Sequence, residues 1–112
     1  MKERDLLLKC VELAKEKKAF DILSMEIKGI SVIADYFLLL SASNPTQARA
    51  ICDYVDDEMS QLDRPPLRKE GYGDARWIIL DFGGLLLHIF QPLEREYYNL
   101  ERLWADAPVE RF

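Results

Sequence analysis

Hydrophobic residues recur along this chain at two spacings, and the spacing separates the expected helices from the expected strands. Apolar residues three and four positions apart predict a helix over residues 2–18. The same spacing over residues 48–62 predicts a second helix, which Ser43 or Asn44 would cap. The second helix is expected to end before a Pro-Pro pair, because proline disfavours the helical conformation of the residue that precedes it.

Shorter apolar runs predict strands. Residues 20–27 alternate roughly between apolar and polar positions, as in a strand with one buried face. Residues 35–42 contain an almost continuous apolar run, which favours a central position in the sheet with both faces covered. A further short strand is expected over residues 67–71.

Two apolar runs, residues 77–82 and 85–90, flank Gly83-Gly84 and predict a β-hairpin. Glycines suit the positive φ of a two-residue type I′ or II′ turn, and such a turn sets the strand register. One face of the hairpin is then wholly apolar and belongs to the core: Ile78, Leu80, Phe82, Leu85, Leu87 and Ile89. The other face carries Trp77, Ile79, Asp81, Leu86, His88 and Phe90.

This second hairpin face has two interpretations. A helix can cover it, with Asp81 and His88 as an internal pair, since the two are diagonal neighbours across the strands. Alternatively, it is a partly open recognition surface with Trp77 as its anchor, because tryptophan and tyrosine dominate binding hot spots. We favour the recognition surface.

A last helix is expected from Leu93 to about Ala105. Tyr98 should be exposed or at a boundary, beside the aromatic sheet face. The inward stripe of this helix would hold Leu93, Tyr97, Leu100, Leu103 and Trp104.

The predicted order of elements is α-β-β-α-β-β-β-α. It indicates an α/β fold of the α+β type, with a mixed sheet of about five strands and roughly three helices. We expect one domain over residues 1–107 and a loose tail over residues 108–112.

The length and charge of the chain limit the kinds of partner and location that are expected. The chain has 112 residues and a formal net charge of −5, which indicates one acidic domain. Such a domain lacks the basic surface that binds phosphate backbones, so we expect a basic protein partner and little direct nucleic-acid contact. No signal peptide or membrane-spanning apolar run is evident, so no membrane contact is expected, and the expected location is the cytoplasm or an organelle matrix. Cys10 and Cys52 are expected as buried free thiols.

The sequence offers little catalytic or metal chemistry. Cys10, Cys52 and His88 are not at metal-ligand spacing, and no phosphate-binding glycine motif is present. Asp35 opens a buried strand, but Phe37 stands where a second carboxylate would be needed to hold a pair of metal ions. We therefore expect no enzyme activity, no metal and no cofactor. A nucleotidyltransferase-like enzyme with displaced acids is the alternative.

Five groups of residues follow one another in an order typical of one protein family. They are Asp35-Tyr36-Phe37, Glu70-Gly71, Trp77-x-x-x-Asp81, His88-Ile89-Phe90 and Arg95-x-x-Tyr98-x-Leu100-Glu101-x-Leu103-Trp104. This pattern resembles the ribosomal silencing factor family, also called RsfS or Iojap, over roughly residues 5–107.

The resemblance implies a nucleotidyltransferase-like fold without catalysis. It also implies binding to universal ribosomal protein fourteen of the large subunit, which blocks joining of the small subunit and lowers translation when nutrients are scarce. A role in large-subunit biogenesis and a homodimer away from the ribosome are implied as well. The partner-binding residues implied on this chain are Trp77, Asp81, His88, Arg95, Tyr98 and Glu101.

Overall fold

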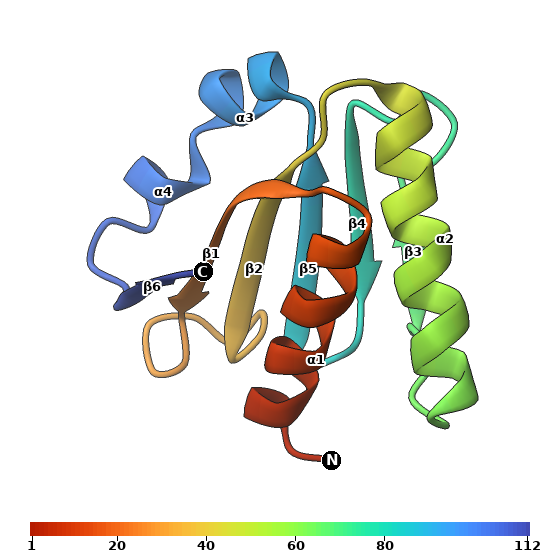
Figure 1. Ribbon diagram of the computed structural model, residues 1–112. Helices are drawn as coiled ribbons and strands as arrows, with labels where there is room; N and C mark the ends of the chain where they lie inside the picture. The colour runs from red at the N-terminus through yellow and green to blue at the C-terminus, as the bar shows by residue number, and fades with distance from the viewer.

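The most apolar strand of the chain lies near the middle of a six-stranded sheet, as predicted. In the computed structural model, which describes residues 1–112, the strand order is β3-β4-β5-β2-β1-β6 (Figure 1). Strands β2 and β5 pair in parallel and all other neighbours are antiparallel, so the sheet is mixed. The elements are α1 (Glu3–Glu16), β1 (Phe20–Glu26), β2 (Tyr36–Ser41), α2 (Pro45–Gln61), β3 (Arg68–Glu70), β4 (Trp77–Asp81), β5 (Leu85–Phe90), α3 (Pro92–Tyr98), α4 (Leu100–Leu103) and β6 (Val109–Arg111).

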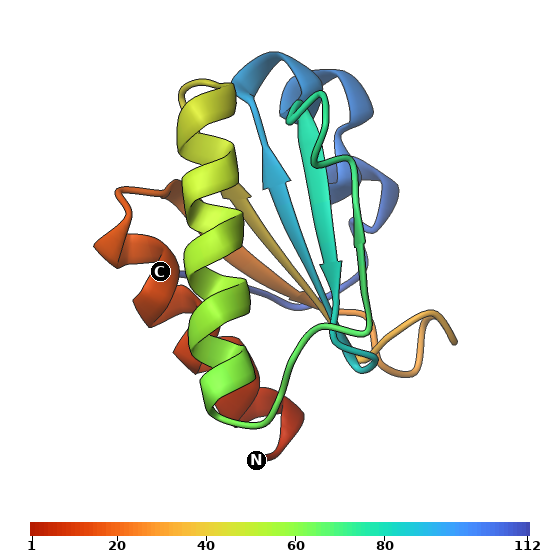
Figure 2. The ribbon, with the colours of Figure 1, turned by 90° about the vertical axis from the view of Figure 1, so that its right-hand side faces the viewer.

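Helices lie on both faces of the sheet, but the cover is unequal. Helices α1 and α2 lie against one face and form the larger core cluster with it, while α3 and α4 lie on the opposite side (Figure 2). Of the two expected caps for α2, Asn44 is the actual one, and its side chain accepts the Gln47 N–H at 2.8 Å. No helix of the protein combines the length and the apolar character that crossing a membrane requires.

The two cysteines are buried and free, as predicted. Cys10 on α1 and Cys52 on α2 both lie in the larger core cluster. Burial raises the pKa of each thiol to about 12, so both stay protonated and behave as small apolar side chains.

The predicted hairpin is confirmed, register included. Trp77 pairs with Phe90 and Ile79 with His88, and the Phe82 N–H donates to the Leu85 carbonyl at 2.9 Å. Only the first glycine of the turn, Gly83, has a positive φ (91°), which favours type II′ over type I′.

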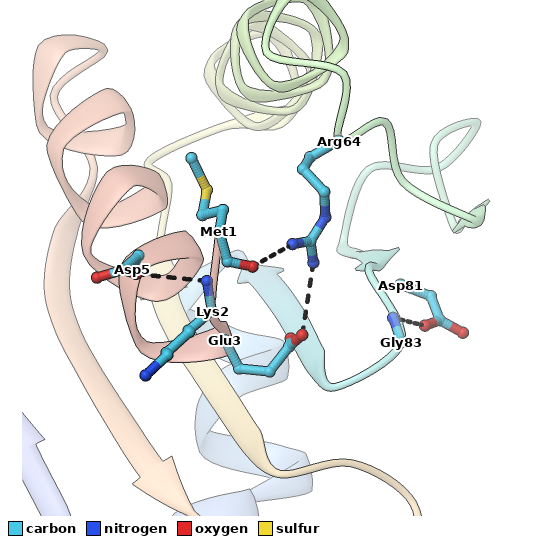
Figure 3. A network of polar contacts seen from close by, with 7 residues as sticks. All are labelled: Met1, Lys2, Glu3, Asp5, Arg64, Asp81 and Gly83. Atoms are coloured by element: carbon cyan, nitrogen blue, oxygen red, sulfur yellow. Dashed lines mark hydrogen bonds and ion pairs between the residues drawn. The ribbon is translucent and has the colours of Figure 1, made fainter.

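Figure 3 shows a hydrogen bond within this turn and a separate group of polar contacts at the N-terminus of α1. The Asp81 carboxylate accepts the Gly83 N–H at 2.8 Å. Arg64 donates to the Met1 carbonyl at 2.7 Å and pairs with Glu3, whose carboxylate lies directly against Gly84. A Cβ at Gly84 would come within 2.6 Å of that carboxylate, so a substitution there would displace the Glu3 side chain.

The prediction of a loose tail over residues 108–112 is wrong. Strand β6 pairs antiparallel with β1, and the Phe112 N–H donates to the Ile22 carbonyl at 2.9 Å. Arg4 of α1 adds an ion pair to Glu110 at 2.6 Å. The pairing satisfies backbone groups of β1 that would otherwise form an open sheet edge, which explains why a segment with no apolar pattern is ordered.

The prediction of one long C-terminal helix is also wrong. Asn99 takes a left-handed conformation with φ 46° and separates α3 from α4, a conformation that asparagine tolerates better than most residues. The expected inward stripe is therefore not continuous across the break. Leu93, Tyr97 and Leu103 are consequently 78%, 82% and 71% exposed, whereas Leu100 is buried.

We expect Gly71→Ala to destabilise the protein strongly. Gly71 has a φ of +78°, and a Cβ there would lie 2.0 Å from the backbone oxygen of Trp77. Left-handed strain costs an ordinary residue about 1–2 kcal/mol, and displacing β4 should bring the total above about 2 kcal/mol. The measurement is urea unfolding at neutral pH.

Gly29→Ala is the matched control for this substitution. Gly29 has a similar φ of +83°, but nothing lies within 4 Å of its added Cβ. Its alanine variant therefore measures the cost of the left-handed backbone alone. Equal losses for the two variants would show that the close approach of Gly71 to β4 has no energetic weight.

Candidate functional site

The second face of the hairpin is covered at β5 and open toward β4, so each of the two interpretations describes part of it. Phe90 and His88 on β5 are 0% and 3% exposed. Above them lies the segment that carries Leu100 and Trp104. This segment packs with residues of β1 and β2 in a smaller core cluster. Trp77, by contrast, is only partly buried.

Trp77 is held from three directions. Its ring stacks on Phe90 with centroids 4.9 Å apart, and the Tyr98 ring of α3 lies 4.6 Å away at a tilt of 43°. The indole N–H donates to Nδ1 of His88 at 3.0 Å. The side chain is therefore ordered and still presents part of its ring to the outside.

His88 is an internal residue, which corrects its expected place on an open surface. The ring lies against Phe37, with centroids 4.7 Å apart at an angle of 67°, and burial lowers the pKa of His88 to about 4. Because Nδ1 accepts the Trp77 bond, the neutral ring carries its proton on Nε2, and Nε2 has no hydrogen-bond partner. The Asp81–His88 pair of the covered-face interpretation is absent, since each residue has a different partner.

Asp81 orders the strand edge and the turn. Besides the Gly83 N–H it accepts two bonds from the Arg68 guanidinium of β3, at 3.0 and 3.3 Å. This bond raises the pKa of Arg68 above its ordinary value. The pair borders a small pocket of about 140 Å³, whose other lining residues are Ile33, Glu70, Ile79 and Leu86.

Arg95 and Glu101 form an internal clamp rather than a pair of free surface charges. The Arg95 side chain is only 11% exposed and bonds Glu101 of α4 at 3.2 Å. It also donates to the Ser41 hydroxyl at 2.8 Å and to the Asp21 carbonyl. Since these partners belong to α4, β2 and β1, the clamp fixes α3 and α4 over the sheet.

Tyr98 is 48% exposed, which confirms its predicted position at the surface. Together with three residues of the uncovered part of the sheet and one of the adjoining loop, it forms what we call the open sheet face. This face consists of Ile33, Trp77, Ile79, Leu86 and Tyr98.

Exposed apolar residues around this face were missed from the sequence. The loop between β1 and β2 carries Ile30, Val32 and Ile33, which are 48%, 104% and 57% exposed. That loop lies on the same side of the sheet as α3 and α4 (Figure 2). Three large apolar residues among the seven between the two predicted strands, 28–34, were the available signal, since loops are ordinarily polar.

A shallow groove of about 560 Å³ lies along α3 and α4, lined partly by Tyr97, Tyr98 and Leu103. Exposed apolar groups that cluster in this way are typical of protein–protein contact sites. No three His, Cys, Asp or Glu side chains of the protein gather where they could hold a metal ion. The position that would need a second acid, Phe37, lies in the smaller core cluster.

We expect the burial of His88 to make stability fall in mild acid. Its pKa is about 4 when folded and 6.5 ordinarily, so between these values the unfolded chain binds the proton and the folded chain does not. Lowering the pH from 7 to 4.5 should therefore cost about 2–3 kcal/mol from this residue.

The measurement is urea unfolding of the wild type and of His88→Leu at both pH values. His88 is the only histidine, and the carboxylates titrate in both proteins, so the difference between the two isolates it. If the difference in unfolding free energy between wild type and His88→Leu does not change with pH, the buried imidazole is not neutral.

The fold is shared with solved structures. A crystal structure of a protein from Chromobacterium violaceum superposes with a TM-score of 0.90 at 20% identity, over 94% of this chain and 88% of the other. One from Bacillus halodurans gives a TM-score of 0.85 at 34% identity, over 98% and 100%. The arrangement of helices and sheet described above is therefore an established one.

Named relatives extend from bacteria to organelles. Ribosomal silencing factors of Bacillus subtilis and Halalkalibacterium halodurans are 37% and 39% identical over 97% of this chain, and 92% and 93% of their own lengths are covered. A mouse protein named for mitochondrial assembly of the ribosomal large subunit is 29% identical over 85% of this chain and 43% of its own. The family model described as ribosomal silencing factor during starvation matches residues 1–112. The chain therefore belongs to the ribosomal silencing factor (RsfS) family.

Proposed function

We propose that this protein represses translation by docking on the large ribosomal subunit and blocking the small subunit from joining. Its relatives are named ribosomal silencing factors, which ties the family to the ribosome. The observation that carries the proposal for this chain is the ordered, partly exposed Trp77 on the open sheet face, beside Tyr98. An aromatic anchor among apolar neighbours is the usual core of a tight protein interface.

The proposed partner is universal ribosomal protein fourteen of the large subunit, a basic protein. A domain with a net charge of −5 is drawn toward such a partner and repelled by bare phosphate backbones. At the border of the open sheet face, Asp81 is already paired with Arg68. Charge would therefore guide the approach, and the apolar residues would supply most of the affinity.

The proposed mechanism is steric and needs no catalysis. A bound domain inhibits when it occupies the volume that the small subunit requires. A Kd of roughly 10 nM corresponds to about −11 kcal/mol, which an interface of ordinary size with a few aromatic anchors can supply. We therefore propose that the protein is not an enzyme and acts in the cytoplasm. Detectable binding of Mg-ATP would favour the nucleotidyltransferase-like alternative.

A second candidate function is assistance in large-subunit assembly, which the name of the mouse relative favours. Both functions use the same large-subunit contact and differ in when it is made. We also propose a homodimer away from the ribosome, for which the exposed Leu93, Tyr97 and Leu103 offer apolar area.

We expect the protein to sediment with free large subunits and to be absent from joined ribosomes in a sucrose gradient. Added before the small subunit, it should reduce the yield of joined ribosomes in a purified joining assay. Sedimentation with large subunits without any effect on joining would favour the assembly function. Absence from large subunits would rule out both.

We expect Trp77→Ala to weaken binding to large subunits by about 2 kcal/mol or more, because it removes the anchor. Trp77 also stacks on Phe90, so circular dichroism must show that the variant is folded. Ile33→Asp avoids this difficulty, since Ile33 is 57% exposed in a loop. A carboxylate placed in the interface should lower the affinity roughly tenfold or more.

Leu8→Ala is the matched control for the binding measurements. Leu8 is an exposed apolar residue, 42% accessible, on α1 at the opposite face of the sheet. Its loss should leave the affinity unchanged. If Ile33→Asp binds as well as Leu8→Ala, docking does not use the open sheet face.

A further inference from the structure

We propose that His88 is a positioning residue for partner docking: from beneath the open sheet face it accepts the indole N–H of Trp77 and fixes the ring in its binding orientation. This inference rests on the proposed docking through that face. It assigns to His88 a role in recognition although the residue is only 3% exposed.

The geometry makes His88 a rigid acceptor. Trp77 and His88 are diagonal neighbours on one face of β4 and β5, and the bond between them is 3.0 Å long. The imidazole lies edge to face with Phe37 and nearly parallel to Phe90, with ring centroids 4.7 and 6.0 Å away. Since these rings are themselves buried, the acceptor nitrogen has one position.

A histidine is an unfavourable choice for this site on packing grounds alone. Its neighbours are aromatic, and its second nitrogen, Nε2, is buried with no hydrogen-bond partner. An unpaired buried donor destabilises the folded state, and leucine or phenylalanine would fill the site without one. What the imidazole provides and these residues do not is an acceptor at Nδ1 for the Trp77 N–H.

Two consequences follow for the exposed part of Trp77. Its only polar group is already bonded, so the ring meets a partner as an apolar surface that requires no hydrogen bond in return. The ring is also ordered before binding, between the imidazole and the Tyr98 ring. Ordering a large side chain in advance is expected to strengthen binding by about 3- to 10-fold.

A thermodynamic cycle distinguishes positioning from a merely structural role. The variants are His88→Leu, Trp77→Phe and the double substitution, each measured for affinity to purified large subunits. Trp77→Phe keeps an aromatic ring but removes the N–H that His88 accepts. We expect His88→Leu to lower the affinity about 3- to 10-fold in the wild-type background and less than about 2-fold in the Trp77→Phe background. Equal losses in both backgrounds would overturn the proposal.

His88→Asn is the conservative rescue, because its amide oxygen lies close to where Nδ1 lies in histidine. We expect it to recover most of the affinity that His88→Leu loses. It also keeps the test decisive where His88→Leu does not fold. A folded His88→Asn variant that binds no better than His88→Leu would count against an acceptor role.

Exchange of the Trp77 indole proton with water, followed by NMR in the free protein, tests the bond independently of the ribosome. The chain has two tryptophans, so Trp104→Phe assigns the signals. We expect the Trp77 signal to be protected in the wild type and to exchange rapidly in His88→Leu. Rapid exchange in the wild type would overturn the proposal. Protection without any binding to large subunits would instead overturn the docking function, and the role of His88 with it.

Discussion

The pairing of β4 with β5 determines which side chains reach each face of the sheet. Because side chains alternate along a strand, a shift of one residue would turn Ile78 outward and bury Trp77 on the wrong face. The Gly83 turn prevents the shift, and the Asp81 carboxylate secures it by accepting the Gly83 N–H. The larger core and the open sheet face therefore depend on the same two-residue turn.

The incomplete helical cover of the second sheet face determines which apolar side chains stay exposed. Arg95 ties α3 and α4 to β1 and β2, so this segment covers one half of the sheet and leaves the half near β3 open. The left-handed Asn99 then separates the inward Leu100 from the outward Tyr97. One short segment thus closes the smaller core and also presents exposed apolar groups beside Trp77.

Features with local signals could be predicted from the sequence. The central strand, the α2 cap and the hairpin register depend on residues close together in the chain. The break at Asn99 could not be predicted, because asparagine is accepted both within helices and in the left-handed conformation. Strand β6 is three residues long and depends on β1. The internal roles of His88 and Arg95 depend on which segments lie above them, and no local pattern states this.

The residues of the family pattern mostly build the open sheet face, and few of them form its surface. Asp81, Arg95, Glu101 and the indole N–H of Trp77 all have partners inside the domain. The open sheet face that remains accessible is apolar, and the polar groups of Asp81 and Trp77 beside it are already bonded. Recognition by such a face would rest on shape and on the overall negative charge, with hydrogen bonds contributing little. A sequence pattern can therefore identify the family correctly while its most distinctive polar residues make their bonds within the domain.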